Sequence, residues 1–278
     1  MKSSTGKDRS VMKKLCIILV VIPLFILFSL SVALSGEALD RILERGYVVV
    51  GTSGDQPPLT IRAKDGEMIG LDMDIANLFA SNMGVRLKVE MLPFNELLPA
   101  LESGKIDMII SGMTMTPQRN LRVAFAGPYF VSGKGILTTQ AKVERVKDFN
   151  ELNKPDMTII ALKGSTSQAI VESFISKARL ITSPSLESAV QALINGEADA
   201  LVADFHICAV NAMRYRDKGL AAGGVPFTYE PLGVALPADD LLLVNWVNNF
   251  LLNLRGSGDL ETLARRWFND PSWLQQLP

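Results

Sequence analysis

From Tyr47 onward the sequence alternates between short runs rich in β-branched residues and longer segments with helical spacing. The runs that predict strands are Tyr47–Thr52, Leu87–Met91, Ile106–Ile110, Gly135–Thr139, Thr158–Leu162, Ala200–Ala203 and Gly233–Leu236. The segments that predict helices are Asp74–Met83, Glu96–Glu102, Ser167–Lys177, Leu186–Ile194, Phe205–Tyr215, Asp240–Leu254 and Leu260–Phe268. Strands separated by helices of this length are typical of α/β proteins, so we expect a mostly parallel α/β architecture.

The first 35 residues have the composition of an export signal. Five basic residues and one acid precede Leu15, residues 15–34 carry no charge, and small residues follow near Ser35. This pattern predicts a secretory signal peptide, although the apolar stretch is also long enough to remain as a membrane anchor. In both cases the basic start stays inside, and the rest of the chain is expected to be periplasmic or extracytoplasmic.

The exported part has an acidic balance and a single cysteine. The chain has 28 basic and 29 acidic side chains, of which residues 1–35 hold five and one, so the remainder has a net charge of −5. This charge argues against nucleic acid or an anionic membrane surface as a partner. Cys208 has no second cysteine to pair with, and His206 is the sole histidine. We therefore expect no metal or cofactor, and we expect His206 to be half-exposed at the start of its helix.

The segment Ser111–Arg119 follows the apolar run Ile106–Ile110 and has the residues of an anion-binding loop. Small residues after a strand leave backbone N–H groups open, and the guanidinium of Arg119 offers a planar fork of donors to a carboxylate. Open α/β sheets bind ligands just outside the carboxyl ends of their strands. The alternative is a strand-to-turn junction in which Arg119 makes a surface ion pair.

A second copy of part of this region occurs 92 residues later. Leu101–Asp107 has Gly at its fourth position and Asp at its seventh, and so does Leu193–Asp199. In both copies a helix is expected to end at the glycine and a strand to begin at the aspartate. The second strand then leads to Asp204. Either such units recur by chance, or two lobes of related topology present strand ends to a shared cleft.

The segment Lys163–Ser167 predicts a second donor cluster. Ser165 and Thr166 stand where a strand passes into a helix, and the amino end of a helix with a hydroxyl cap suits an anion. The alternative is an N-cap with no ligand. Two donor clusters and the carboxylate of Asp204 together match a zwitterion, with the donors on its carboxylate and Asp204 on its ammonium.

Residues from about 39 to 268 resemble the extracytoplasmic solute-binding proteins of polar amino-acid ABC transporters, family 3. The matching features are Gly51-Thr-Ser with Pro58, Gly70-Leu-Asp-Met-Asp74, Phe94 to Leu101, Gly104-Lys-Ile-Asp107, Ser111 to Arg119, Phe125-Ala-Gly-Pro-Tyr129, Gly164-Ser-Thr166, Asp199 to Asp204 and Trp267-Phe268. Each feature alone is weak evidence, and their order along some 230 residues is strong evidence.

The resemblance implies a type II periplasmic-binding-protein-like α/β fold. Two lobes joined by two crossover strands would hold the ligand in the cleft between them. Lobe 1 would be residues 39–133 and 230–278, and lobe 2 residues 134–229, after the signal peptide or anchor at 1–35. The expected function is capture of an amino acid by a monomer that delivers it to a membrane permease, with no cofactor.

The resemblance also implies roles for individual residues. Arg119 matches the arginine that holds the α-carboxylate, and Asp204 matches the acid that receives the α-ammonium. Ligand contacts to the same head group are expected at Gly112, Thr114 and Thr166, with Ser111 and Ser165 beside them. Phe94 matches an aromatic residue that packs against the ligand side chain.

Two positions depart from the family pattern. Gln56 stands where many relatives have an aromatic residue, and Ser53 stands where an acid is common. Without that acid and aromatic, a cationic ligand is disfavoured. We therefore expect a smaller or amide-bearing amino acid, with Gln56 and Ser53 on the side-chain half of the pocket.

The alternative from another class is an enzyme on the same scaffold. The segments Leu39–Gly46 and Thr52–Asp55 are also similar to exported cyclohexadienyl dehydratases. Those enzymes are expected to use a glutamate as general acid in the helix after the lobe-2 glycine loop, and Gln168 stands at the matching position. An amide cannot give and recover a proton as a carboxyl group does. A ligand-sensing domain is a third alternative.

Overall fold

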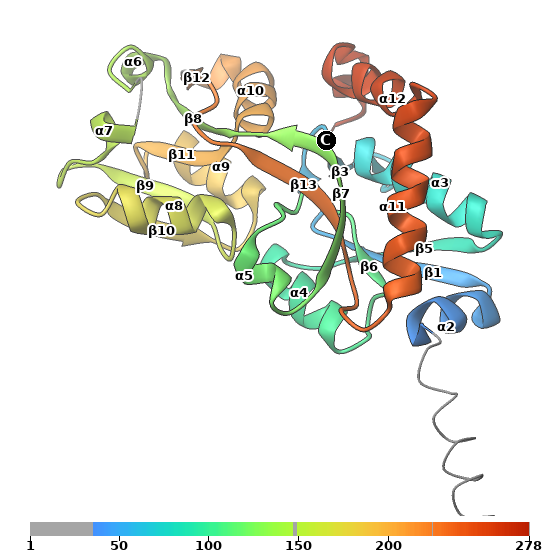
Figure 1. The fold of residues 1–278 in the computed structure, drawn as a ribbon. Helices are drawn as coiled ribbons and strands as arrows, with labels where there is room; N and C mark the ends of the chain where they lie inside the picture. Colours follow the sequence, from blue (N-terminus) through green and yellow to red (C-terminus); the bar gives the residue numbers. More distant parts are fainter. Residues whose placement is uncertain (1–35, 147–148, 224, 278) are drawn as a thin grey trace, which may run out of the picture.

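The computed structural model describes residues 36–146, 149–223 and 225–277. The predicted signal peptide or anchor lies outside these residues. Two five-stranded sheets form the framework (Figure 1). The first has the order β5 (Arg86–Met91), β1 (Tyr47–Thr52), β6 (Met108–Ile109), β13 (Glu230–Leu236) and β7 (Ala124–Ser132). The second has the order β10 (Arg179–Ser183), β9 (Thr158–Leu162), β11 (Ala200–Asp204), β8 (Lys134–Thr139) and β12 (Leu220–Gly223).

Helices cover both sheets, and a small third sheet joins β2 (Asp55–Gln56), β3 (Thr60–Arg62) and β4 (Met68–Ile69) (Figure 1). With the first sheet go α2 (Glu37–Arg45), α3 (Leu71–Met83), α4 (Phe94–Glu102), α5 (Pro117–Asn120), α11 (Leu241–Gly256), α12 (Asp259–Phe268) and the 3₁₀ helix η3 (Pro271–Gln276). With the second go α6 (Gln140–Val143), α7 (Phe149–Leu152), α8 (Thr166–Phe174), α9 (Leu186–Ile194), α10 (Phe205–Arg214) and the 3₁₀ helix η2 (Arg216–Lys218).

The expectation of mostly parallel strands holds for only three strands in each sheet. Strands β5, β1 and β6 are parallel, as are β10, β9 and β11. The other two strands of each sheet pair in antiparallel fashion. Parallel neighbours need a helical crossover between them. The chain instead passes directly from β7 to β8 at Gly133, and it returns from β12 to β13. Strands β8 and β13 therefore enter their sheets without a helical crossover.

The sequence echo corresponds to the same construction in both sheets. Asp107 precedes β6, donates its N–H to the Val49 carbonyl at 2.9 Å and accepts the Val49 N–H at 2.7 Å. Asp199 precedes β11 and makes the same pair of bonds with Thr158, each 2.7 Å long. Each aspartate ties the start of its strand to the neighbouring parallel strand. The two five-stranded sheets therefore share strand order and local anchoring.

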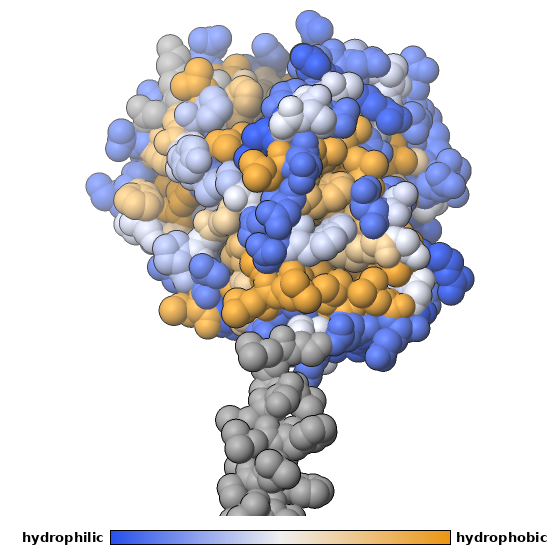
Figure 2. All heavy atoms as spheres, turned by 45° about the vertical axis from the view of Figure 1, so that its right-hand side comes forward, coloured by the Kyte–Doolittle hydropathy of each residue, from blue (hydrophilic) through white to orange (hydrophobic). Residues whose placement is uncertain are grey.

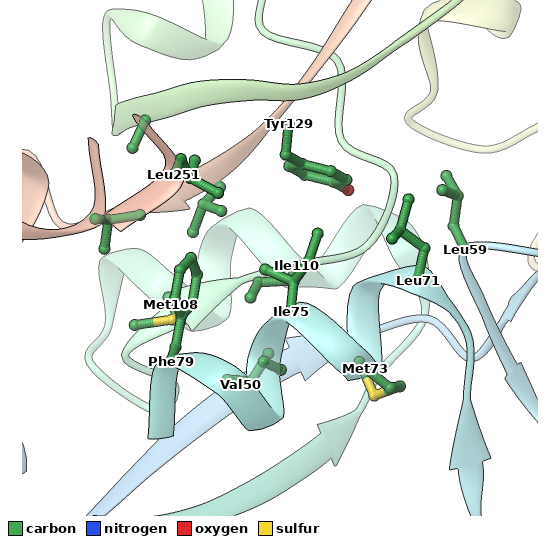
Figure 3. Close-up of a cluster of buried hydrophobic side chains, with 14 of the residues drawn as sticks. Val50, Leu59, Leu71, Met73, Ile75, Phe79, Met108, Ile110, Tyr129 and Leu251 are labelled. Carbon is green, nitrogen blue, oxygen red and sulfur yellow. The ribbon is translucent and has the colours of Figure 1, made fainter. Parts of the chain in front are cut away.

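The larger core lies between the first sheet and α3 and α11. Figure 3 shows Phe79 and Ile75 of α3 close to Met108 and Val50 from the sheet. Leu251 of α11 belongs to the same cluster. Phe79 also packs edge-on against Trp246 and Phe250, at ring distances of 5.9 and 4.8 Å. This core fixes β6, whose carboxyl end carries the predicted anion loop.

In the part of the chain that the structure describes, no helix combines the length and the apolar character needed to cross a membrane. The face drawn in Figure 2 has hydrophilic side chains around much of its edge and apolar residues gathered in bands between them. The exposed apolar side chains include Leu241, Leu242 and Leu43. Exposed apolar residues are common on folded proteins, so they indicate no particular partner.

Candidate functional site

The carboxyl ends of β6, β9 and β11 meet around a small cavity between the two sheets. Its lining residues come from both sides: Gln56, Phe94, Gly112, Thr114, Arg119, Lys134, Leu162, Ser165, Thr166, Ser167, Leu186, Ala203, Asp204 and Ile207. The cavity measures about 20 Å³. That is room for about one water molecule, so a larger ligand can enter only if the two sides move apart.

Arg119 lines this cavity and contacts both of its sides. The short helix α5 begins after Thr116, whose hydroxyl accepts the Arg119 N–H at 3.2 Å, and this cap fixes the backbone at Arg119. Its Nη1 donates to the Thr114 carbonyl at 2.8 Å and its Nη2 to the Gly164 carbonyl at 3.1 Å. The second bond joins the loop after β6 to the loop after β9. The guanidinium donors are thus bonded to two carbonyl groups. A ligand carboxylate would compete with these carbonyls for the same donors.

Burial lowers the pKa of Arg119 to about 10, while the neighbouring acids Glu230 and Asp204 act in the opposite direction. The guanidinium therefore keeps its charge at neutral pH. It also lies 5.6 Å from the centre of the Phe94 ring, within the range of a cation–π contact. A charged, partly desolvated donor next to an aromatic wall suits a small carboxylate with an attached side chain.

The loop before Arg119 is supported by an aspartate whose role the sequence does not reveal. Its position predicts that Asp72 caps and charges the start of a helix. Asp72 does lie in the first turn of α3, but the N-cap is Gly70 and the Asp72 side chain is fully buried. It accepts the Gly112 N–H at 2.9 Å and the Tyr129 hydroxyl at 2.8 Å. Burial raises the pKa of Asp72 to about 7, against the effect of these two donors. Asp72 therefore positions the glycine that lines the cavity.

Gly112 itself has a positive φ of 54°, and a side chain there would meet Gln56 Oε1 at 2.9 Å. Gln56 packs against the loop and donates from Nε2 to the Ser111 carbonyl at 2.9 Å and to Ser53 Oγ at 2.9 Å. The Ser53 N–H donates to Ser111 Oγ at 2.9 Å. These three side chains form one hydrogen-bonded layer, of which Gln56 faces the cavity.

On the other side, β11 ends at Asp204, which is paired inside the protein. Lys134 Nζ lies 2.5 Å from Asp204 Oδ1 and 3.5 Å from Glu230 Oε2. Only 2% of the Lys134 surface is exposed, against 6% for Asp204 and 5% for Glu230. Glu230 also accepts the hydroxyls of Thr166 at 3.1 Å and Thr228 at 2.9 Å. Lys134 and Glu230 were not predicted as site residues, because each stands at the first position of a strand that follows a chain crossing.

The loop after β9 behaves as its residues indicate. Ser165 Oγ accepts the Gln168 N–H at 3.2 Å, so it is an N-cap of α8. Thr166 Oγ1 lies 3.4 Å from Thr114 Oγ1 across the cavity. The hydroxyl groups of the two donor clusters are therefore neighbours.

Eight of the ten residues proposed from the sequence line the cavity: Gln56, Phe94, Gly112, Thr114, Arg119, Ser165, Thr166 and Asp204. Ser53 and Ser111 lie behind it, in the layer that Gln56 completes. Gln168 is outside the lining, where its Oε1 accepts the Gly164 N–H at 2.8 Å. Gln168 therefore does not face the cavity, and its amide does not bear on whether the cavity is catalytic.

His206 is buried, so the expectation of a half-exposed side chain is wrong. Its ring packs edge-on against Phe130 and Phe268, at ring distances of 5.8 and 5.6 Å, and Nδ1 lies 3.1 Å from Ser132 Oγ. These aromatic neighbours come from β7 and α12, which the helix position alone does not place near His206. Burial lowers the pKa of His206 to about 4. No group of three or more potential metal ligands occurs in residues 36–146, 149–223 and 225–277.

The buried imidazole gives a prediction on pH dependence. Because the pKa of His206 falls from 6.5 to about 4 on folding, the unfolded chain binds more protons between these values. Stability is then lost as pH falls through this window, by roughly 3 kcal/mol at most. We expect that lowering the pH from 7 to 4 reduces the stability of the wild type more than that of His206→Gln. Urea unfolding at each pH measures the two losses. A stability difference that stays constant over this range would contradict the prediction.

The matched comparison removes the opposing effect of Asp72. The raised pKa of Asp72 stabilises the folded protein at low pH, and this contribution is lost as pH rises through about 7. Both proteins contain Asp72, so its titration cancels in the difference between them.

Comparison with known proteins adds independent findings. Residues 48–270 match the family model described as bacterial extracellular solute-binding proteins, family 3. The chain is 26% identical over 244 residues to the cyclohexadienyl dehydratase of Pseudomonas aeruginosa PAO1, covering 88% of this chain and 91% of that one. It is 29% identical over 241 residues to the ABC transporter glutamine-binding protein GlnH of Bacillus subtilis strain 168, covering 84% and 85%.

Among solved structures, the crystal structure of the ancestral amino acid-binding protein AncCDT-1, described as a precursor of cyclohexadienyl dehydratase, is similar. It superposes with a TM-score of 0.77 at 36% identity, covering 83% of this chain and 99% of that one. The expected type II fold, with two α/β lobes joined by two crossovers, is confirmed.

Proposed function

Because the chain belongs to family 3 of the bacterial extracellular solute-binding proteins, we propose that it captures an amino acid and delivers it to an ABC transporter permease. The observation that carries this proposal is the meeting of Arg119 and Asp204, which come from different sheets and line one cavity. A guanidinium on one side and a carboxylate on the other match the two ends of a zwitterion. The lobes are residues 39–133 with 230–278 and residues 134–229, and the chain crossings near Gly133 and before Glu230 support these limits.

Ligand capture works as a shift between open and closed arrangements. In the arrangement seen here, the bond from Arg119 to the Gly164 carbonyl and that from the Leu186 N–H to Asp55 join the two sides. An entering amino acid offers its carboxylate to Arg119 and its ammonium to Asp204. The ligand favours closure by as much as it binds the closed form better than the open form. The permease then receives the closed form.

The side chains that line the cavity suit ligand binding better than dehydration of a substrate. The acid that lines the cavity, Asp204, is in an ion pair with Lys134, and an ionised carboxylate has no proton to donate to a leaving group. The similarity to a cyclohexadienyl dehydratase keeps the enzyme as the second candidate. Incubation with prephenate or arogenate separates the two, because the enzyme releases an aromatic product and the binding protein leaves both compounds unchanged.

Export and oligomeric state complete the proposal. Residues 1–35 direct the protein out of the cytoplasm, either as a cleaved signal or as an anchor, and the binding domain acts as a monomer. Mass determination of the mature protein shows whether residues 1–35 are removed. Sedimentation shows whether the exported domain is monomeric, and a dimer would require a revised account of docking to the permease.

We predict that one or more of the twenty common amino acids raise the melting temperature by several degrees at saturating concentration. The reason is mass action, since a ligand at about a hundred times its Kd adds about 2.7 kcal/mol to the stability of the form that binds it. A thermal-shift screen followed by calorimetric titration measures this effect. The absence of both a shift and a heat of binding with all twenty would refute the proposed function.

A further inference from the structure

Four charged side chains around Lys134 balance one another at the cavity. Arg119 and Lys134 supply two positive charges, and Asp204 and Glu230 supply two negative charges. Among the cavity-lining residues of the described chain, Arg119, Lys134 and Asp204 are the charged ones, and Glu230 lies behind them against Lys134. Lys134, Asp204 and Glu230 are buried, and Arg119 is half-buried. The charges of these four side chains therefore sum to zero.

The balance of these four charges affects ligand binding because the closed cleft has almost no room for water. A buried charge without a partner is costly, whereas one that is paired is tolerated. An amino acid with an uncharged side chain adds one positive and one negative charge, so the sum stays at zero. An arginine or lysine ligand leaves one extra positive charge, and a glutamate or aspartate ligand leaves one extra negative charge.

Lys134 occupies the place where this balance is decided. Its ammonium contacts the carboxylate of Asp204, the group proposed to receive the ligand ammonium. One lysine cannot neutralise both Asp204 and Glu230, so one negative charge is left for the ligand ammonium. Lys134 can stay with Glu230, whose carboxylate is held by the hydroxyls of Thr166 and Thr228. Without Lys134, the cleft would have a place for a second cationic group.

We propose that Lys134 and Glu230 select the net charge of the ligand, so that the site takes α-amino acids with uncharged side chains. This inference rests on the proposed function and narrows it to one class of ligand. It is independent of Gln56, which faces the cavity, and of Ser53, which holds the Gln56 amide from behind. Gln56 then discriminates among uncharged amino acids by shape and hydrogen bonding.

The test uses ligand pairs that differ in charge and little in shape. Calorimetric titration compares asparagine with aspartate, glutamine with glutamate, and citrulline with arginine. For the wild type we expect the uncharged member to bind more tightly in every pair that binds, by about tenfold or more. Tighter binding of a charged member to the wild type would overturn the proposal.

Two substitutions should move the selectivity in opposite directions. In Lys134→Met the cleft has an extra negative charge, so the ratio of arginine to citrulline affinity should rise about tenfold or more. In Glu230→Gln it has an extra positive charge, so the ratio of glutamate to glutamine affinity should rise similarly. The double variant is neutral again and should return to the wild-type order. Unchanged ratios in both single variants would overturn the proposal.

The ratio of affinities separates charge selection from a structural role. A variant with a distorted cleft loses affinity for both members of a pair, whereas a change in charge balance alters their ratio. Lys134→Arg keeps the charge and should keep the preference for uncharged ligands. If no amino acid binds the wild type or any variant, the proposed function itself fails. If amino acids bind but their ratios do not move, only the charge selection fails.

Discussion

Replacing Arg119 with alanine is expected to weaken amino-acid binding by roughly a hundredfold or more. The guanidinium is the charged donor group that the first sheet contributes to the cavity, and its burial strengthens its bond to a carboxylate. Its loss also removes the bond to the Gly164 carbonyl that joins the two sides. Both effects weaken the closed, ligand-bound form. Calorimetric titration with the amino acid identified by the thermal screen measures the change.

The matched control lies three residues further along the chain. Arg122 is an exposed arginine that pairs with Glu102, so Arg122→Ala should bind the ligand as the wild type does. Arg119→Lys keeps the charge but not the fork of donors, and we expect an intermediate affinity. If Arg119→Ala binds with wild-type affinity, the assignment of the carboxylate to Arg119 is wrong.

Replacing Asp204 with asparagine should reduce both binding and stability. The substitution preserves shape but removes the charge proposed to receive the ligand ammonium, so affinity should fall roughly a hundredfold. It also leaves the ammonium of Lys134 with Glu230 alone, at 3.5 Å. Breaking a buried ion pair typically costs about 3–5 kcal/mol. Urea unfolding at pH 7 and calorimetric titration measure the two losses.

A second substitution separates these effects. Asp204→Asn combined with Lys134→Met removes the unpaired cation, so stability should largely recover while affinity for the amino acid does not. A 2-hydroxy acid of the same shape has no ammonium, so Asp204→Asn should change its affinity little. If the single variant still prefers the amino acid over the hydroxy acid as strongly as the wild type does, the ammonium does not bind at Asp204.

Much of the fold follows from local sequence patterns. The predicted Tyr47–Thr52, Thr158–Leu162 and Leu186–Ile194 have the observed bounds of β1, β9 and α9. These segments have clear apolar patterns, and the helix α9 is capped by its neighbour in sequence, Ser185. The strand β7 was missed because Gly127 and Pro128 within it favour a turn. It lies at the edge of the first sheet, and its register with β13 shifts between Ala126 and Phe130, so an irregularity in the pairing accommodates Gly127 and Pro128.

Local sequence patterns were enough to predict the elements that line the cavity. Arg119, Thr114, Thr166 and Asp204 could be found because each follows a recognisable strand or begins a recognisable helix. The echo of Asp107 in Asp199 pointed to two similar sheets, and local hydrogen bonds reproduce it. These features depend on residues close together in the chain, where spacing alone limits the geometry.

The partners of Asp204, in contrast, depend on long-range packing. Lys134 is 70 residues away in sequence, and Glu230 lies beyond the second chain crossing. Lys134 reaches Asp204 because the strand order of the second sheet places β8 beside β11 in antiparallel register, whereas Glu230 comes from β13 of the first sheet. The same applies to Asp72, which reaches Gly112 from another helix. Spacing along the chain cannot encode such contacts, because the packing of whole sheets and helices sets them.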